Sequence, residues 1–417
     1  MKTLIPMFVW VAIFLSAVQA QSADTDKTPQ EVENLAKQLV LKLGDPDFQE
    51  REAASRKLAK LGLGALKAIK EGLKNSDTEI RARCLSLYPK IRTPDLKRRI
   101  EELAADKEGR ITDFPLGATY EKICGKDENA RKFFIMLCRD NLELLDDAAN
   151  NLPNTGEAFI DLIYEIGNRG NGVLSPTTEV AAMLLIAADE KIGPSIVEAN
   201  RNQMKGGDRN YQRFIGIFWT PKYEALMIDT NYGLYFRKLL FAWAKRLPEP
   251  LAMQSFLFFI RDMIKKKVMN LQGDSDTLVF LKDFAVSTSA QLMPYQKGEA
   301  MSIIAGASIS KNDQLAFFEE KFFKDETSLE PVVGFDLKDQ SKIRVETRAC
   351  DYALAVCVKL SGQSFQDYGF DILGSQSDMF NSWIYAGFTK DETRKAAFKK
   401  YEQWRKANLI NKDESPG

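Results

Sequence analysis

The chain has 417 residues, of which 45% are hydrophobic and 28% are charged, as in an ordinary soluble globular protein. Its 58 lysines and arginines balance its 58 aspartates and glutamates, so no overall field favours nucleic acid or another polyanion as partner. The sequence contains no histidine, which argues against Ser-His-Asp and Cys-His catalysis and against the common zinc and non-haem iron sites.

Residues 1–20 have the pattern of a secretory signal peptide. Lys2 supplies the positive start, an apolar run covers residues 4–18, and the small residue Ala20 ends it. We expect cleavage near Ala20, a disordered leader over residues 21–27, and a periplasmic or secreted protein with no stable membrane span. An uncleaved anchor is the alternative, because the apolar run approaches the length of a spanning helix.

The stretch 43–88 repeats a short unit, and a fixed period of this kind is typical of stacked helical pairs. Three pairs of identical residues recur at an offset of thirty positions: Leu43 and Leu73, Asp47 and Asp77, and Arg51 and Arg81.

Each repeat is expected to contain two helices joined by a tight elbow. The spacing of apolar residues predicts a first helix over 48–61, ended by Gly62, and a second helix over 66–73. Ser76 and Glu79 are predicted to form a capping box that begins the next helix.

A helix capped by Thr28 precedes the repeat, and another charged helix follows it. Thr93 and Pro94 predict that this later helix begins there and ends near Ala105. We therefore assign residues 28–105 to one repeat domain and place a boundary in the polar connector after it.

The repeat resembles the HEAT repeats of bacterial HEAT-like proteins, in which an Asp-x-x-x-Arg pair recurs at the start of each first helix. The pattern Gly-Lys-Asp-x-x-Ala-Arg-x-x-Phe over residues 125–134, the segment 367–370 and the final helix resemble a family of large secreted bacterial HEAT-like proteins. The resemblance implies a partner-binding scaffold and names no partner. Kinship with HEAT-like phycobilin lyases is a further alternative, which rests on the repeat alone.

The remainder of the chain is predicted to be mainly helical. Residues 114–324 contain helix-length apolar patterns and are either degenerate repeats or a fused helical domain. Residues 330–343 could hold a short extended segment, helices return over 344–407, and 408–417 form a polar tail. The predicted fold class is all-α, an α-solenoid of HEAT-like helix pairs that continues into an irregular helical region.

Two sets of residues are interpreted as structural. Asp47 and Asp77 are expected to cap helices while Arg51 and Arg81 reach an aspartate of a neighbouring repeat, which forms a ladder. The cysteines are odd in number and have apolar neighbours, so we expect small buried side chains without disulfides or metal. They are Cys84, Cys124, Cys138, Cys350 and Cys357.

An aromatic cluster between residues 211 and 259 has two interpretations. It can form a stacking groove for a sugar or peptide, but its helical spacing favours a thick helical core. Trp219 and Tyr223, on either side of Pro221, are the members expected at the surface.

These observations predict a non-catalytic scaffold of the cell envelope that binds a protein or peptide partner. We expect the second helices of the repeats to form the binding face, with Lys67, Lys70, Glu71 and Lys74. The alternative is a ligand- or carbohydrate-binding module, or an unrecognised enzyme, that uses the aromatic cluster as a pocket wall. No catalytic, cofactor or metal-binding residue is assigned, and nucleic acid is not expected as a partner.

Overall fold

The computed structural model is helical apart from one β-hairpin in the residues that it describes. The predicted signal peptide and leader, 1–27, and the end of the predicted tail, 411–417, lie outside these residues. The described residues are 28–106, 108–150, 155–168, 177–203, 209–247, 250–269, 275–287, 293–307, 309–335, 342–374 and 383–410.

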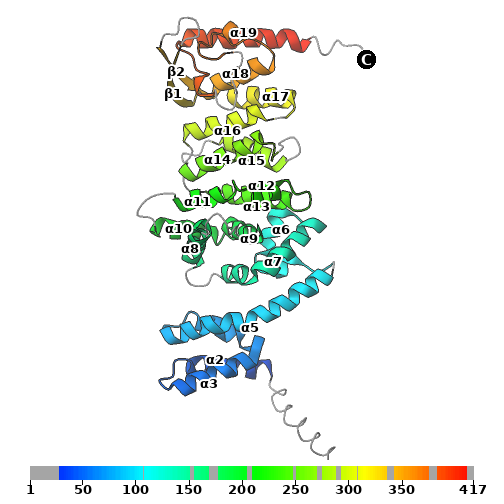
Figure 1. Cartoon of the computed structure of the whole chain (residues 1–417), viewed down its shortest axis with the longest axis vertical. Coiled ribbons are helices and arrows are strands. Elements are labelled where there is room, and N and C mark those ends of the chain that lie inside the picture. Colours follow the sequence, from blue (N-terminus) through cyan, green and yellow to red (C-terminus); the bar gives the residue numbers. More distant parts are fainter. Residues whose placement is uncertain are drawn as a thin grey trace, which may run out of the picture. The chain divides into compact units, whose positions relative to one another are not determined.

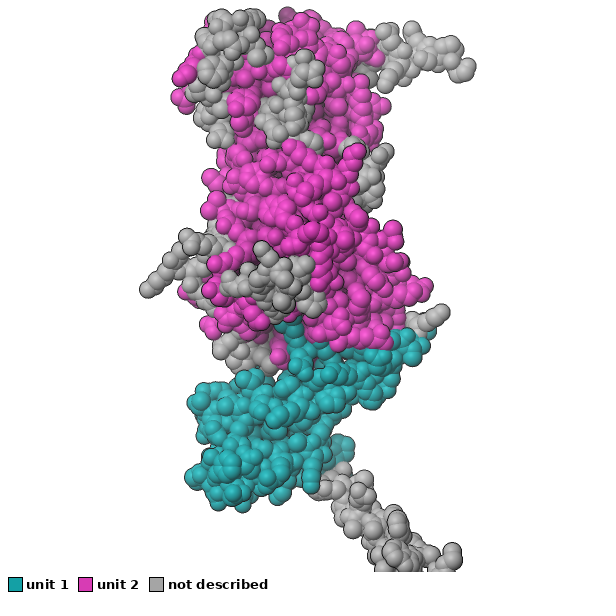
Figure 2. Space-filling model, viewed as in Figure 1, with its two compact units in different colours: residues 1–110, 142–144 teal, residues 111–141, 145–417 magenta. Residues whose placement is uncertain are grey.

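The chain divides into two compact units (Figure 2). Unit 1 contains the residues up to 110 together with Leu142–Leu144, and unit 2 contains residues 111–141 and those from 145 onward. The division after Arg110 falls in the polar connector, and unit 2 includes both the middle and the C-terminal regions. Among the described residues, no helix is long and apolar enough to span a membrane.

In its described residues, unit 1 consists of three helices of up to 14 residues and one helix of 28 residues, which pack on one another (Figure 1). They are α2 (Pro29–Lys42), α3 (Phe48–Leu61), the 3-10 turn η2 (Gly62–Ala65), α4 (Leu66–Gly72) and α5 (Thr78–Ala105). The bounds of α3 agree with the prediction, because Asp47 caps its start and Gly62, with a φ of 54°, ends it. Thr28 and Glu31 form the capping box of α2.

Helix α5 corrects the prediction that a new helix begins at Thr93 and Pro94. It runs without a break past Pro89 and Pro94. Proline removes a backbone hydrogen bond, but the face of α5 carries a continuous series of buried apolar residues on both sides of the prolines. We attribute the unbroken helix to this packing.

The predicted cap at Ser76 is also wrong, because Asp77 is the N-cap of α5. The Asp77 carboxylate accepts hydrogen bonds from the backbone N–H groups of Glu79 (2.8 Å) and Ile80 (3.2 Å). An aspartate carboxylate caps as well as a serine hydroxyl, and one residue of register decides which of the two is used. Asp47 caps α3 in the same way, through Gln49 N at 2.8 Å.

The arginines of the repeat do not reach the aspartate of a neighbouring repeat, which corrects the predicted ladder. Arg51 Nη1 donates to the carbonyl oxygen of Asp45 at 2.7 Å, and Arg81 Nη1 donates to that of Asn75 at 2.6 Å. Each arginine therefore holds the turn that precedes its own helix. The first helices of the two repeats are joined by ion pairs of arginine with glutamate instead, Arg51 with Glu79 at 3.2 Å and Arg83 with Glu52 at 2.8 Å.

Unit 2 begins with η3 (Ile111–Asp113), α6 (Gly117–Cys124) and α7 (Glu128–Ala149), whose residues 142–144 belong to unit 1. The helices that follow are α8 (Thr155–Asn168), α9 (Thr177–Ala188), α10 (Gly193–Gln203), α11 (Arg209–Ile217), α12 (Pro221–Ile228), α13 (Gly233–Ala244), α14 (Pro250–Lys265), α15 (Ser275–Val286), α16 (Pro294–Gly306) and α17 (Lys311–Phe322).

Helix α9 is interior, with every residue from Val180 to Ala188 buried. Helix α13 packs on α9 and also contacts α6, α12 and α15. An apolar helix that is buried on all sides has no solvent face, so its neighbours must provide the surface around it.

Two turns of unit 2 share a local structure forty positions apart in sequence. Asp189 accepts backbone hydrogen bonds from Lys191 (2.9 Å) and Ile192 (3.1 Å). Asp229 accepts the equivalent bonds from residues 231 and 232, at 2.9 and 2.7 Å. A glycine follows four residues after each aspartate, and a Cβ there would come within 2.8 Å of a backbone carbonyl oxygen.

The C-terminal part contains a hairpin where the sequence left a short extended segment open, and its second strand continues to Arg348, so residues 344–348 are not helical as predicted. Strands β1 (Ser328–Phe335) and β2 (Lys342–Arg348) pair antiparallel, with Val332 opposite Val345. Next come α18 (Ala349–Leu360), η4 (Gln366–Tyr368), η5 (Trp383–Tyr385) and α19 (Asp391–Ile410). Helix α18 packs on α17, α19 and β2, and α19 includes the first three residues of the predicted tail.

Candidate functional site

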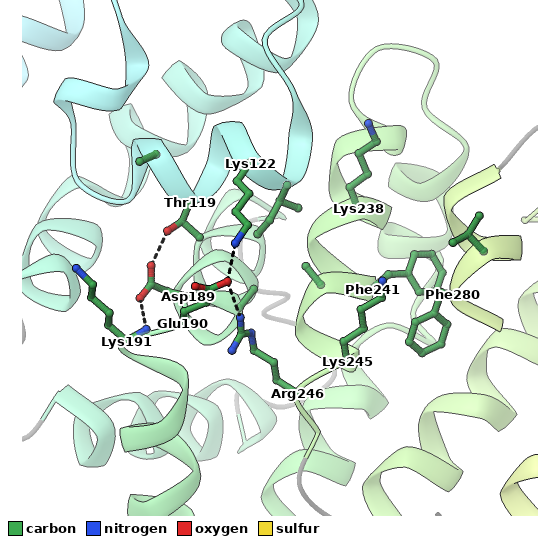
Figure 3. Close-up of a pocket in the computed structure, with 15 residues that line it drawn as sticks. Thr119, Lys122, Asp189, Glu190, Lys191, Lys238, Phe241, Lys245, Arg246 and Phe280 are labelled. Carbon is green, nitrogen blue, oxygen red and sulfur yellow. Dashed lines mark hydrogen bonds and ion pairs between the residues drawn. The ribbon is translucent and has the colours of Figure 1, made fainter. Parts of the chain in front are cut away.

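A groove of about 790 Å³ is formed by four segments of unit 2 (Figure 3). They are α6, the turn after α9, one face of α13 and the first half of α15. We call it the α6–α13 groove. Five cationic side chains and two carboxylates line it: Lys122, Lys191, Lys238, Lys245, Arg246, Asp189 and Glu190.

Helix α13 supplies one wall because four of its lining residues share a face. Lys238, Phe241, Ala242 and Lys245 occur at intervals of three and four, so they lie on one stripe of the helix. Lys245 is the C-cap residue of α13, where a cation also interacts favourably with the helix dipole.

Asp189 fixes the turn that contributes the acidic side chains. Besides capping the turn, its carboxylate accepts a hydrogen bond of 2.5 Å from the Thr119 hydroxyl on α6. Asp189 is 8% exposed, and its carboxylate is hydrogen-bonded to groups of the protein itself. It is therefore not accessible to a ligand in the groove. The bond to Thr119 attaches the turn to α6, and the next residue, Glu190, projects into the groove (Figure 3).

Glu190 interacts with two of the cations. Its Oε1 atom lies 2.6 Å from Lys122 Nζ and 3.7 Å from Arg246 Nη2. The hydrogen bond from Lys122 holds the pKa of Glu190 below its usual value. The Glu190 side chain nevertheless remains 66% exposed, so this is an exposed ion pair of the kind that contributes little to stability.

The remaining cations differ in how they are held. Lys238 Nζ lies 3.5 Å from the carbonyl oxygen of Cys124 and is half-buried. Lys191 and Lys245 are exposed, and no described residue forms a hydrogen bond or ion pair with either amine. With five cationic side chains against two carboxylates, the lining of the groove has an excess of positive charge.

The floor of the groove is apolar. Phe241 and Phe280 are each 3% exposed, and their ring centroids lie 5.2 Å apart. Val279 is 50% exposed and offers an aliphatic surface to the groove. The arrangement can hold an anionic group against the cations while an apolar group rests on the floor.

The α4 residues predicted to bind a partner lie on the surface of unit 1. Lys67 Nζ is 2.7 Å from Glu33 Oε1, and Glu71 is 3.9 Å from Lys37. Hydrogen bonds from Lys67 and Lys37 lower the pKa of Glu33 to about 2. These contacts place Lys67 and Glu71 in an ionic network with α2.

The two other predicted residues, Lys70 and Lys74, are exposed as well. Lys70 lies over the Tyr88 ring at 5.8 Å, and Lys74 is in the turn after α4. The structure thus gathers all four predicted residues on one short segment of unit 1.

The aromatic cluster is mainly core, and the expected exposure of Tyr223 is wrong. Tyr223 is 0% exposed and packs against Phe218 and Phe236, whereas Trp219 is 37% exposed. Helix α12 turns its Tyr223 side inward, and sequence proximity to Pro221 does not reveal this orientation. Most other members of the cluster are fully buried, so they do not form an accessible stacking wall.

The five cysteines are free and buried, as expected. Burial raises the pKa of Cys84 to about 11 and that of Cys350 to about 12, so both thiols stay protonated near neutral pH. Within the described ranges, no group of three histidine, cysteine or acidic residues lies close enough together to hold a metal ion.

Sequence reasoning missed the α6–α13 groove because its residues come from four separated segments. The stripe of Lys238, Phe241, Ala242 and Lys245 was the one visible signal. Asp127, by contrast, was predictable from its position before a helix: it caps α7 through Asn129 and Ala130, and it also accepts a hydrogen bond from the Tyr235 hydroxyl.

No known family model matches the sequence. No curated protein matches it at a significant level either.

One buried carboxylate outside the groove gives a pH-dependent prediction. Glu299 on α16 is 1% exposed; Arg261 Nη1 lies 2.8 Å from its Oε1 atom, and the Trp383 side chain is a second polar neighbour. Burial raises the pKa of Glu299 above its usual value of 4.5, although Arg261 opposes this. The charged form is therefore disfavoured in the folded protein.

We expect Glu299→Gln to raise the melting temperature at pH 7 but not at pH 4. The stability that Glu299 contributes is fully present below its unfolded pKa and is lost as the pH rises through the raised folded pKa. Glutamine has no charge and avoids this loss. Each kcal/mol added to the free energy of unfolding raises the melting temperature by roughly 2–4 °C. Glu320→Gln, at an exposed position of α17, is the control. A lower melting temperature for Glu299→Gln at pH 7 would show that the Arg261 ion pair outweighs desolvation.

Proposed function

We propose that the protein is a non-catalytic binding protein of the cell envelope, which holds a protein or peptide partner through its α6–α13 groove. The observation that carries the proposal is the cationic excess of an open groove with an apolar floor. Two carboxylates line the groove with five cations, and one of the two, that of Asp189, is hydrogen-bonded to Thr119 and to the backbone of its own turn. Charge complementarity of this kind gives specificity and speeds association.

The proposed architecture is an α-solenoid of HEAT-like helix pairs that continues into unit 2. Support comes from the recurring turn of unit 1, in which Asp47 and Asp77 cap and Arg51 and Arg81 bind carbonyls at the same offset. Stacked helical pairs expose long surfaces on which partners bind. The apolar run of residues 1–20 supports export as part of the same proposal.

The α4 face with Lys67, Lys70, Glu71 and Lys74 is the second proposed contact surface. Its side chains are exposed, and Lys67 and Glu71 form ion pairs with Glu33 and Lys37 of α2. The alternative function, an aromatic sugar-binding wall or active site, has less support because most of the rings that it needs at the surface are buried.

We expect Lys191→Glu combined with Lys245→Glu to weaken binding of an acidic peptide about tenfold or more, because two attractions become repulsions. The probe is a fluorescein-labelled peptide in which phenylalanines are separated by glutamates, and anisotropy is measured at low and moderate salt. The control pair is Lys395→Glu with Lys399→Glu, two exposed positions of α19 that change the net charge equally.

If the groove variant and the α19 control variant lose peptide affinity equally, the groove is not the binding site. A further variant reverses the charges of Lys67 and Lys70, which measures the contribution of the α4 face separately. If the wild-type protein binds the glutamate peptide no better than the same peptide with glutamines, the proposed function is wrong.

A further inference from the structure

We infer that Glu190 occupies, in the unbound protein, the position that a carboxylate of the partner takes, and that an acidic peptide segment binds by displacing it from Lys122 and Arg246. The inference rests on the proposed function. It adds which residues bind the partner's carboxylate, Lys122 and Arg246, and which residue of the protein competes for them, Glu190. The partner segment is one in which carboxylates alternate with apolar side chains.

The geometry of Glu190 is that of a replaceable carboxylate. Lys122 on α6 and Arg246 after α13 approach the same oxygen, Oε1, from two different elements (Figure 3). Both cations are accessible, with Lys122 71% exposed and Arg246 34% exposed. An incoming carboxylate can therefore reach them without entering the protein interior.

The backbone at Glu190 stays fixed when its side chain leaves. Asp189 holds this turn through Thr119, Lys191 and Ile192, so the position of the backbone does not depend on the Glu190 side chain. Because the Glu190 side chain is 66% exposed, rotating it into solvent buries no charge. Displacement exchanges one exposed ion pair for another and leaves the groove intact.

The other lining residues favour a peptide over a single small anion. Lys191 and Lys245 are two further exposed cations, so one ligand with several carboxylates can use all of them. Between the cations the floor is apolar, with Val279 half exposed. A chain that carries both carboxylates and apolar side chains matches both features, whereas inorganic phosphate matches only the first.

We expect Glu190→Gln to bind the glutamate-phenylalanine peptide about three- to fivefold more tightly than the wild-type protein, because Lys122 and Arg246 are then free for the ligand. The measurement is fluorescence anisotropy of the labelled peptide. Glu224→Gln is the matched control, since Glu224 forms an ion pair with Lys266 away from the groove and its loss changes the net charge equally.

The tightening should depend on the freed cations. Arg246→Gln should cost more affinity in the Glu190→Gln background than in the wild-type protein, because only there is Arg246 unoccupied before binding. A peptide with alanines in place of the phenylalanines should bind more weakly to both proteins.

Two results would overturn the inference. If the wild-type protein binds the peptide but Glu190→Gln binds it no more tightly than Glu224→Gln does, Glu190 is not a competitor and only the proposed function survives. If citrate displaces the peptide at equal carboxylate concentration, the occupant is a small acid and not a peptide segment.

Discussion

Asp351→Ala is expected to lower the free energy of unfolding by about 3–5 kcal/mol, since it leaves the Arg394 guanidinium buried without its main partner. Asp351 is 0% exposed on α18, and Arg394 of α19 is 8% exposed. Two hydrogen bonds join them, from Arg394 Nε at 2.7 Å and from Arg394 Nη2 at 3.2 Å. The pair fixes α19 against α18.

Asp351 also accepts a hydrogen bond of 3.0 Å from the backbone N–H of Arg348, where β2 passes into α18. The substitution therefore removes a helix cap as well as a buried charge. We expect the melting temperature to fall by roughly 6 °C or more, as measured by circular dichroism. Asp391 is the control because it contacts the same arginine from a position that is 58% exposed.

Asp391→Ala should cost about 1 kcal/mol or less, because an exposed ion pair is weak. If the two alanine variants were equally stable, the Asp351–Arg394 pair would be no stronger than a surface contact. The attachment of α19 would then depend on its apolar contacts alone.

Local signals in the sequence predicted the parts of the fold that depend on local chemistry. Thr28 and Glu31 cap α2, and the limits of α3 follow from Asp47 and Gly62. In each case the deciding groups are within a few residues of the helix end. The choice of Asp77 over Ser76 shows the limit of this reasoning, since both residue types can cap.

Tertiary packing decided the features that the sequence misplaced. The prolines of α5 remain within a helix because the helix buries apolar residues on both sides of them. Tyr223 faces inward because α12 packs on α9 and α13, which the sequence around Pro221 does not specify. Packing of distant elements outweighed local propensity at both sites.

The candidate site was the least predictable feature. Thr119, Asp189, Lys238 and Val279 come from segments separated by forty or more residues, and no period or motif connects them. In the sequence, each lysine of the groove has the pattern of an ordinary solvated side chain. The groove exists only because α13 packs against α6, α9 and α15 at once.

We expect Phe218→Ala to lower the free energy of unfolding by about 3–5 kcal/mol, because it creates a cavity in the aromatic core. Phe218 is 0% exposed. Five aromatic rings surround it at centroid distances of 5.4 to 6.2 Å: Phe214, Tyr223, Phe236, Trp243 and Phe259. Urea unfolding followed by tryptophan fluorescence and circular dichroism measures the loss.

The next residue gives the control. Trp219 is 37% exposed and makes an edge contact with Phe259 at 5.6 Å, so Trp219→Ala should cost about 1 kcal/mol. Similar losses at both positions would contradict the assignment of the cluster as core and would restore the aromatic wall as a candidate surface.

Phe218→Ala also tests whether the aromatic core and the proposed binding site are independent of each other. Phe218 does not line the α6–α13 groove, so peptide affinity should stay within about twofold of the wild-type value at temperatures where Phe218→Ala is folded. Reduced stability with unchanged affinity is the result expected if the rings support the fold while Lys122, Lys245 and Arg246 bind the partner. A loss of affinity in the folded variant would instead place the partner on the aromatic cluster.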